Sequence, residues 1–270
     1  MIINHRVRNI EVCQENAGIV KANGYTNSLG EEVGFDHSLE DHQRVLVYSP
    51  DGLKELVERF GNSGSAVSTK SIEVRDEDSF ARSTDCVLNF ANSRHPGGGY
   101  LSGASAQEEA LCRQSTLYAS ISSEEARQMY DSNRDVEDFD TDYLLLSPCV
   151  EVFRNKSLNF LEHPHTTAVI SAAVPNLYGR ARDVSLSELQ EYYRHRIRQI
   201  LCVAAENGYR TITLGAWGCG AFGNDPAEVA GAFKDILVDE GFAECFDRVI
   251  FAIPEGKDGN LQVFRDVYGI

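Results

Sequence analysis

Two glycine-rich loops, each between a short apolar run and a segment with helix-forming character, most restrict how this 270-residue chain can fold. The first loop follows the run "DCVLNFAN" at 85–92 and begins with three consecutive glycines, Gly97, Gly98 and Gly99. The second, "GAWGCGAFGND" at 215–225, follows the run "TITL". Nearly continuous apolar runs are typical of strands covered on both faces. Because parallel strands end at the same edge of a sheet, we expect both loops at the carboxyl edge, where open α/β folds bind ligands.

The rest of the chain alternates between strand-like and helix-like segments, which predicts an α/β fold with a largely parallel sheet. The main expected strands are 44–50, 85–92, 142–148, 150–155, 166–175, 210–214 and 247–255. The main expected helices are 52–60, 185–207 and 260–268.

Local signals refine this outline in five places. Asp51 is expected to cap the helix at 52–60, and Ser105 a helix over about 105–120. The segment "SIEVRDEDSFAR" at 71–82 indicates a short strand and then a short helix. Residues 18–35 indicate a β-hairpin. The acidic stretch 121–141 is expected to be an exposed helix and loop with a solvated surface.

Composition limits the function classes. A net charge of −16 argues against nonspecific nucleic-acid binding, in which Lys and Arg neutralise phosphates. The seven cysteines form no CxxC pair, so neither a disulfide framework nor a zinc site is expected. They favour a reducing compartment, and the chain lacks an apolar run of membrane-spanning length and a secretory signal. We therefore expect a cytoplasmic protein that does not bind membranes or nucleic acid.

Two adjacent glutamates, Glu108 and Glu109, follow the triple glycine by a short interval. Such a pair at a helix N-terminus is usually no more than a favourable dipole interaction. Within reach of a glycine-rich loop, however, a carboxyl group can give and take a proton in sugar chemistry. Adjacent helical residues point about 100° apart and cannot flank one bond, so one catalytic and one positioning carboxyl is the better interpretation.

The second loop suits a diphosphate, because its glycines let successive N–H groups turn inward and the helix beginning near Pro226 adds its positive end. No GK[ST] follows, so it is not a Walker A loop, and its GxGxxG match is weak evidence for a dinucleotide fold. The seven histidines show no ligand spacing, and no metal or cofactor is expected.

The stretch "PGGGYLSGASAQEEALCR" resembles the GGG-x(6–8)-QEE signature of poly(ADP-ribose) glycohydrolases, with seven residues between the two motifs. "VLNFANSRHPGGG", "GAWGCGAFGNDP" and "FAIPE" are similar to the compact bacterial and fungal branch of that family. One departure is His95, where relatives often have Asn. The resemblance implies a three-layer α/β/α macrodomain with a mixed, largely parallel central sheet over residues 43–270. Residues 1–42 would be a small N-terminal extension with a hairpin packed on the core.

The resemblance also implies roles for individual residues. Glu109 would be the catalytic acid and base, with its pKa raised by burial and the Glu108 charge. Glu108 would hold the ribose hydroxyls, and Gln107 would orient the pair. The terminal ribose and diphosphate would lie against Asn92, Gly97, Gly98 and Gly99. The amides of Gly218, Cys219, Gly220, Ala221 and Phe222 would hold the diphosphate, with Phe222 flanking the ribose.

The function implied is hydrolysis of ribose–ribose O-glycosidic bonds in poly(ADP-ribose), mainly from chain ends, by a monomer that releases ADP-ribose. ADP-ribosylated proteins are the other expected substrate source. Two alternatives stay open at the level of sequence: hydrolysis of a mono-ADP-ribosyl bond, and noncatalytic binding of ADP-ribose. The noncatalytic macrodomains lack the QEE glutamates, which counts against the last alternative.

Overall fold

The structure, a computed structural model, describes residues 5–61, 71–136 and 139–270. Its strands are β1 (Gly24–Thr26), β2 (Glu32–Gly34), β3 (Leu46–Tyr48), β4 (Ile72–Arg75), β5 (Cys86–Phe90), β6 (Leu144–Arg154), β7 (Phe160–Ala172), β8 (Thr211–Leu214) and β9 (Arg248–Ala252). Its α-helices are α1 (His5–Ala22), α2 (Leu39–Gln43), α3 (Pro50–Gly61), α4 (Gln107–Gln114), α5 (Leu117–Ile121), α6 (Arg127–Ser132), α7 (Leu186–Glu206), α8 (Pro226–Lys234) and α9 (Asn260–Tyr268).

A seven-stranded mixed sheet forms the centre of the protein, in the order β3-β6-β7-β5-β8-β9-β4. The pairs from β7 through β5, β8 and β9 to β4 are parallel, whereas β6 pairs antiparallel with both β7 and β3. The expected α/β fold with a largely parallel sheet is therefore confirmed.

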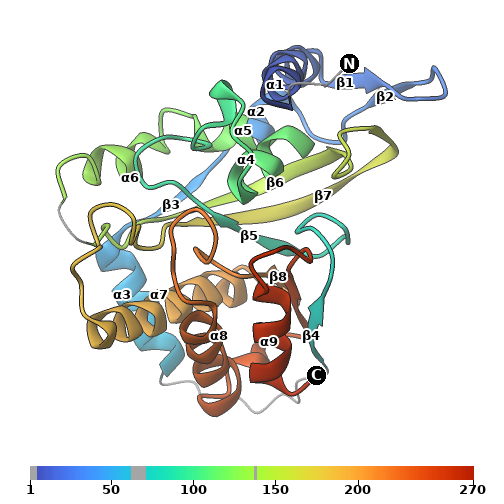
Figure 1. Cartoon of the computed structure of the whole chain (residues 1–270). Coiled ribbons are helices and arrows are strands. Elements are labelled where there is room, and N and C mark those ends of the chain that lie inside the picture. Colours follow the sequence, from blue (N-terminus) through green and yellow to red (C-terminus); the bar gives the residue numbers. More distant parts are fainter. Residues whose placement is uncertain (1–4, 62–70, 137–138) are drawn as a thin grey trace.

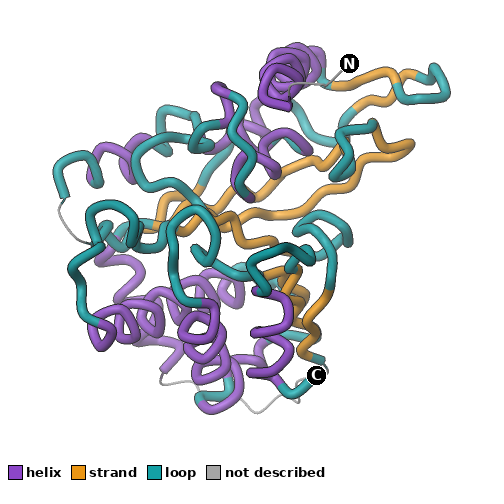
Figure 2. The backbone as a smooth tube through the Cα atoms, in the orientation of Figure 1, coloured by secondary structure: helices purple, strands orange, loops and turns teal. Residues whose placement is uncertain are grey.

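Helices cover both faces of this sheet, which makes three layers (Figure 1). Strand side chains alternate between the faces, as the two-residue period of a strand requires. Leu88 and Leu146 pack among α3, α7, α8 and α9. Val87 and Leu145, one residue earlier in each strand, pack among α4, α5 and α6 on the opposite face. The course of the chain shows loops gathered where the parallel strands end, between the two helical layers (Figure 2).

The N-terminal part begins with α1, and the hairpin occupies only β1 and β2. The expected hairpin over 18–35 was therefore wrong in its first residues, because 18–22 complete the last turns of α1. Tyr25 and Phe35 of this part pack against Phe153 of β6. The division of the chain at residue 42 remains a prediction.

The helix expected over 105–120 is two shorter helices, α4 and α5, and Ser105 is not its cap, because Ala106 occupies that position. The break has a tertiary cause. Thr116 donates its backbone N–H to the Glu151 carbonyl and accepts from the Glu151 N–H through its hydroxyl, each at 3.0 Å. These bonds join the chain to β6, and no local signal predicts them.

Three other local predictions also need correction. Pro50 already lies in α3, so Asp51 is in its first turn, and the Ser49 hydroxyl accepts from the Gly52 N–H instead. Turns and bends follow β4 in place of a short helix, because the Asp78 carboxylate accepts from the Phe80 N–H. The stretch 121–141 is more than a solvated surface, since Met129 of α6 is fully buried. Residues 137–138 of this stretch lie outside the described residues.

The long helix predicted over 185–207 is confirmed as α7. Ser185 caps it in a capping box with Glu188, and Gly208 follows its end with φ +75°. Among the described residues, no helix has the length and apolar character needed to cross a membrane.

Candidate active site

A cleft of about 490 Å³ lies beyond the carboxyl ends of β4, β5, β8 and β9. Both glycine-rich loops reach it, as expected from their positions after parallel strands. From the first loop and α4 it is lined by Asn92, Gly98, Gly99, Gln107, Glu108 and Glu109. From the second loop it is lined by Gly218, Gly220, Ala221 and Phe222.

Glu109 lies in the first turn of α4 and is 7% exposed. Its Oε1 accepts a 2.8 Å hydrogen bond from the Gly99 N–H. Its Oε2 is buried and has no partner among the described residues. A carboxyl group with one oxygen fixed by the backbone and the other unpaired beside a cleft is placed to exchange a proton with a ligand.

Glu108 is held more completely and is 3% exposed. Its Oε2 accepts from the Asn92 N–H at 2.9 Å, and its Oε1 accepts from the Asn89 side-chain amide at 3.3 Å. Asn89 also donates to the Ser171 hydroxyl on β7 at 2.9 Å. The carboxyl group is thus tied to two central strands of the sheet.

Burial raises the pKa of Glu108 to about 8, and the neighbouring Glu109 charge acts in the same direction. The hydrogen bonds from Asn92 and Asn89 lower the pKa but do not offset the burial. Glu108 is therefore mostly protonated at neutral pH. Glu108 is the residue expected to position the substrate, so a ligand would meet its neutral form at neutral pH.

The three glycines of the first loop have three different environments. Gly97 has φ +69°, and a Cβ there would lie 3.0 Å from the Tyr118 ring, so this residue packs on protein and does not line the cleft. Gly98 has φ +56°, and a Cβ would lie 2.7 Å from Glu109 Oε1. Gly99 donates its N–H to that same oxygen. The bare backbone thus makes room for the glutamate side chains as well as for a ligand.

Gln107 fastens the start of α4 to the end of β5. Its side-chain oxygen accepts from the Phe90 N–H at 2.9 Å, and its amide nitrogen donates to the Leu88 carbonyl at 2.9 Å and the Ser79 hydroxyl at 3.1 Å. Gln107 contacts neither glutamate carboxyl group through these bonds; it places both by placing the helix that carries them.

Asn92 shapes the turn that precedes the glycines. Its side-chain oxygen accepts from the N–H groups of Arg94 and His95, each at 2.9 Å. This Asx-type turn directs the Asn92 N–H to Glu108. His95, at the position where the family pattern departs, is exposed.

The second loop is held from below by Asn224. Its side chain donates to the carbonyls of Pro175 at 2.9 Å and Gly218 at 3.1 Å, and accepts from the Tyr193 hydroxyl at 2.6 Å. In the part of the chain that the structure describes, the amides of Gly220, Ala221 and Phe222 make no hydrogen bond. These groups are available to an anion at the cleft.

Two expectations about the second loop are not met. The Cys219 N–H already donates to the Ala216 carbonyl at 3.1 Å, and Cys219 does not line the cleft. The positive end of α8 is also taken, because the Asp225 carboxylate accepts from the N–H groups of Ala227 and Glu228. An anion would therefore rely on the loop amides and not on this helix end.

The cleft has a second end that the sequence analysis missed, lined by Asp78, Ser79, Ile253, Asp258 and Asn260. These residues follow β9, which neighbours β8 in the sheet, and β4, which neighbours β9 at the sheet edge. The sequence could have indicated these residues by their position directly after predicted strands. Burial raises the pKa of Asp78. Within the described ranges, no group of three or more His, Cys, Asp or Glu side chains could hold a metal ion.

Comparison with known proteins bears on this cleft. Residues 13–155 match the family described as "Microbial-type PARG, catalytic domain", where PARG stands for poly(ADP-ribose) glycohydrolase. This range contains the triple glycine and both glutamates. No curated protein matches the chain.

Solved structures give the same family. The Thermomonospora curvata poly(ADP-ribose) glycohydrolase is 34% identical, with a TM-score of 0.90 over 97% of this chain and 100% of that one. The same enzyme bound to the inhibitor ADP-HPD matches at 34% identity and a TM-score of 0.86, over 97% of this chain and 99% of that one. The Deinococcus radiodurans enzyme in complex with ADP-ribose is 35% identical, with a TM-score of 0.76 over 85% of this chain and 96% of that one.

The family match spans more than half of the chain, and these structural matches cover most of it at above 30% identity. The cleft described above lies where the two glycine-rich loops of this fold meet. The chain belongs to the microbial-type poly(ADP-ribose) glycohydrolases, which are glycosidases built on a macrodomain-like α/β fold.

Proposed function

We propose that this protein hydrolyses the ribose–ribose O-glycosidic bonds of poly(ADP-ribose), mainly at chain ends, and releases ADP-ribose. The observation that carries the proposal is Glu109, whose Oε1 is fixed by the Gly99 N–H while Oε2 is unpaired among the described residues, beside the cleft. A relative at 35% identity is in complex with ADP-ribose, which supports the choice of ligand.

In the proposed reaction, Glu109 enters as the acid. Its proton passes to the leaving 2′-oxygen of the preceding unit as the bond between that oxygen and the ribose C1″ breaks, and the electron pair stays on the oxygen. The sugar becomes an oxocarbenium ion. Water then attacks C1″, and the Glu109 carboxylate takes the proton that the water loses. The product is ADP-ribose, and Glu109 regains its starting state.

Glu108 is proposed to act in its neutral form. With a pKa of about 8 it adds little negative charge beside Glu109 at neutral pH. A neutral carboxyl group can both donate to and accept from ribose hydroxyls, which a carboxylate cannot. Ionisation of Glu108 above about pH 8 would remove the O–H that it donates to the ribose, so we propose that activity declines there.

The second loop is proposed to hold the diphosphate with the amides of Gly218, Gly220, Ala221 and Phe222, with Phe222 flanking the ribose. The cleft contains no Lys or Arg among its described lining residues, so binding would depend on neutral amides. The bound diphosphate would keep its negative charge and could stabilise the nearby oxocarbenium ion.

The setting of this activity is also a proposal. All seven cysteines are free, which supports a reducing compartment such as the cytoplasm. We propose a monomer that requires no metal, cofactor or nucleic acid.

The decisive experiment compares the wild type, Glu109→Gln and Glu125→Gln on purified poly(ADP-ribose) and on a mono-ADP-ribosylated protein, with free ADP-ribose as the readout. Glu125 is exposed on the surface and serves as the matched control. We expect polymer cleavage by the wild type and Glu125→Gln, and a loss of about 10²- to 10⁴-fold in Glu109→Gln with ADP-ribose binding retained.

Each other outcome has a definite meaning. Polymer binding without release by the wild type would identify a noncatalytic reader. Release only from the mono-modified protein would identify a mono-ADP-ribosyl hydrolase. Full activity of Glu109→Gln would remove Glu109 from the acid–base role. Accumulation of long internal fragments before ADP-ribose would contradict the exo mode.

A further inference from the structure

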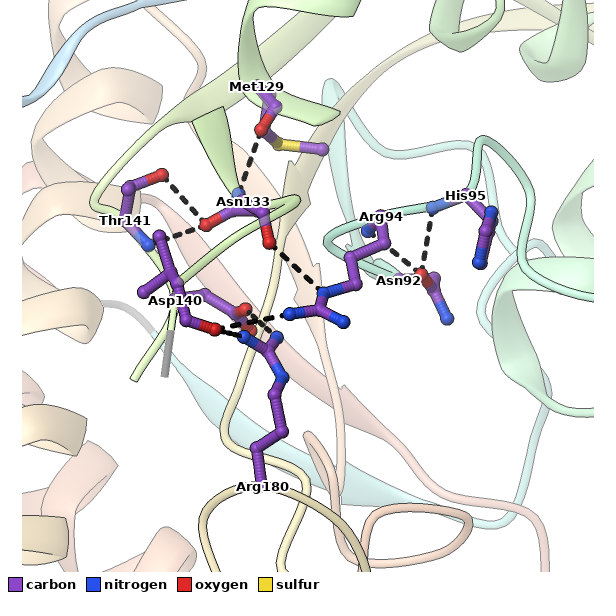
Figure 3. Close-up of polar contacts among 9 residues, drawn as sticks. Asn92, Arg94, His95, Met129, Asn133, Asp140, Thr141 and Arg180 are labelled. Carbon is purple, nitrogen blue, oxygen red and sulfur yellow. Dashed lines mark hydrogen bonds and ion pairs between the residues drawn. The ribbon is translucent and has the colours of Figure 1, made fainter. Parts of the chain in front are cut away.

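Three segments that are far apart in the sequence meet beside the active site (Figure 3). One is the turn after β5 that carries Asn92 and Arg94. Another follows α6 and contributes Asn133 and the carbonyl of Val136. The third is the loop after β7, which carries Arg180.

Arg94 joins the first two segments. Its guanidinium donates from Nε to the Asn133 carbonyl at 3.0 Å and from Nη2 to the Val136 carbonyl at 3.1 Å. Its backbone N–H donates to the Asn92 side chain, and the Asn92 N–H donates to Glu108 Oε2 at 2.9 Å. A continuous series of hydrogen bonds therefore runs from the segment after α6 to a carboxyl group of the cleft.

Arg180, from the third segment, donates to the same carbonyl. It donates to the Val136 carbonyl and, at 2.6 Å, to the Asp140 carboxylate, whose side chain is 7% exposed. The loop that carries Arg180 also reaches the second glycine-rich loop, because the Leu177 N–H donates to the Phe222 carbonyl at 2.9 Å.

Asn133, whose carbonyl accepts from Arg94, is itself held in place. Asn133 is 1% exposed. Its side chain accepts from the N–H and hydroxyl of Thr141 at 2.7 and 2.9 Å and donates to the Met129 carbonyl at 2.9 Å. Met129 is fully buried in the core beneath α4 and α6. Figure 3 shows both guanidinium groups reaching the chain beside this anchored asparagine.

We infer that Arg94 and Arg180 are positioning residues for the reaction, which meet at the Val136 carbonyl and set the turn that holds Glu108 against the loop that carries Phe222. This inference rests on the proposed function of those two sites. Arg94 makes no ion pair among the described residues, so the two hydrogen bonds to carbonyl groups hold its guanidinium in position. A lysine keeps the charge but lacks the planar fork that reaches both carbonyls.

The two arginines should affect different kinetic constants. Arg94 acts on the carboxyl pair, so its loss should lower kcat, whereas Arg180 acts on the diphosphate loop, so its loss should raise KM and the ADP-ribose Kd. Glu108 faces Glu109 and Cys112 of α4 and Tyr130 of α6. None of these changes in Arg94→Lys. Arg94→Lys should displace the turn and so weaken the bond from the Asn92 N–H to Glu108, which favours the charged carboxylate. The pKa of Glu108 should then rise, and the decline of kcat on the alkaline side should move to higher pH.

The test measures kcat, KM and the kcat–pH profile on poly(ADP-ribose), and the ADP-ribose Kd by calorimetry, in Arg94→Lys, Arg180→Lys and the double variant. The controls are Arg134→Lys and Arg182→Lys, whose side chains are each 72% exposed. We expect kcat of Arg94→Lys to fall about ten- to a hundredfold, which is the range for a small misplacement of a catalytic group. The decline of its kcat on the alkaline side should move to higher pH. Arg180→Lys should weaken ADP-ribose binding by a comparable factor. In the double variant, kcat/KM should fall by less than the product of the two single-variant decreases in kcat/KM.

Wild-type kcat and pH profile in Arg94→Lys would overturn the inference. A decrease in kcat that merely follows the folded fraction, with an unchanged kcat–pH profile, would also overturn it. So would decreases in kcat/KM that multiply strictly in the double variant. If Arg94→Lys does not fold, Thr141→Val carries the same test, because it removes one support of Asn133 and should give a smaller shift in the same direction; an unchanged profile there would overturn the inference. Glu109→Gln separates the two proposals: if it is inactive while Arg94→Lys is normal, only this inference fails, and if it is fully active, the proposed function itself fails.

Discussion

The backbone N–H of Gly99 donates a 2.8 Å hydrogen bond to Oε1 of Glu109, so the glycine loop holds the carboxyl group ten residues further along the chain. This bond leaves Oε2 as the only carboxyl oxygen of Glu109 without a partner among the described residues. The neighbouring Gly98 has no space for a side chain, because a Cβ would lie 2.7 Å from that same Oε1. The loop and the carboxyl group thus form one unit.

We expect Gly98→Ala to inactivate the enzyme with only a modest loss of stability. The new methyl group would displace the Glu109 carboxyl end, and a displacement of this kind costs about a hundredfold in kcat. The φ of +56° adds about 1–2 kcal/mol of strain for a residue with a Cβ. Steady-state kinetics and urea unfolding measure the two effects. Gly231→Ala in α8 is the control, since nothing lies within 4 Å of its Cβ position; equal kinetics in the two variants would disprove the argument.

We expect Glu108→Gln to stabilise the protein increasingly as pH rises. The folded-state pKa of Glu108 is about 8, above the ordinary 4.5, so between these values the folded protein holds a proton that the unfolded chain releases. Wild-type stability therefore falls as pH rises through this window, by at most about 1.4 kcal/mol per pH unit from this group. The contribution is favourable below pH 4.5 and is lost above pH 8.

The measurement is urea unfolding of the wild type and Glu108→Gln at several values between pH 5 and 9. The difference in unfolding free energy should grow up to about pH 8 and then level off. Glu125→Gln, at an exposed glutamate, should show no such growth. A gap that stays constant with pH would show that Glu108 titrates normally.

The glycines of the second loop should separate into a structural and a ligand-facing residue. Gly218 has φ +76°, and a Cβ would lie 2.4 Å from the Val174 side chain, so Gly218→Ala should destabilise the fold. Gly220 has no neighbour within 4 Å and lines the cleft, so Gly220→Ala should keep the melting temperature and weaken ADP-ribose binding. Thermal unfolding and calorimetric titration distinguish these outcomes; the reverse pattern would assign the diphosphate elsewhere.

Tyr193→Phe should loosen the second loop from beneath. Its hydroxyl donates at 2.6 Å to the Asn224 side chain, and both residues are buried. Removal of this bond should cost about 0.5–1.5 kcal/mol of unfolding free energy and lower ADP-ribose affinity. Tyr268→Phe is the control, because the Tyr268 hydroxyl has no partner among the described residues. Similar losses in both variants would rule out a specific role for the Asn224 contact.

Local patterns were enough for the alternation of strands and helices and for the place of the two loops. The strand at 85–92 and the helix at 185–207 depend on signals within a few residues, so the sequence predicts them directly. The helix expected over 105–120 shows where this stops. The helix breaks at Thr116 because this residue binds Glu151, 35 residues further along the chain. Helix propensities depend on neighbouring residues only, so they cannot predict this contact.

By itself, the sequence pointed to the family through the resemblance of its GGG and QEE motifs. It also predicted the position of the site, because both glycine-rich loops follow buried strands. The tertiary structure decided what each residue does there. It buried Glu108 and so raised its pKa, gave one oxygen of Glu109 to Gly99, used the Cys219 amide inside its own loop, and brought Arg94 and Arg180 to one carbonyl. Burial and hydrogen-bond partners depend on segments that meet only when the chain is folded, and for that reason the chemical state of the site could not be predicted from local sequence.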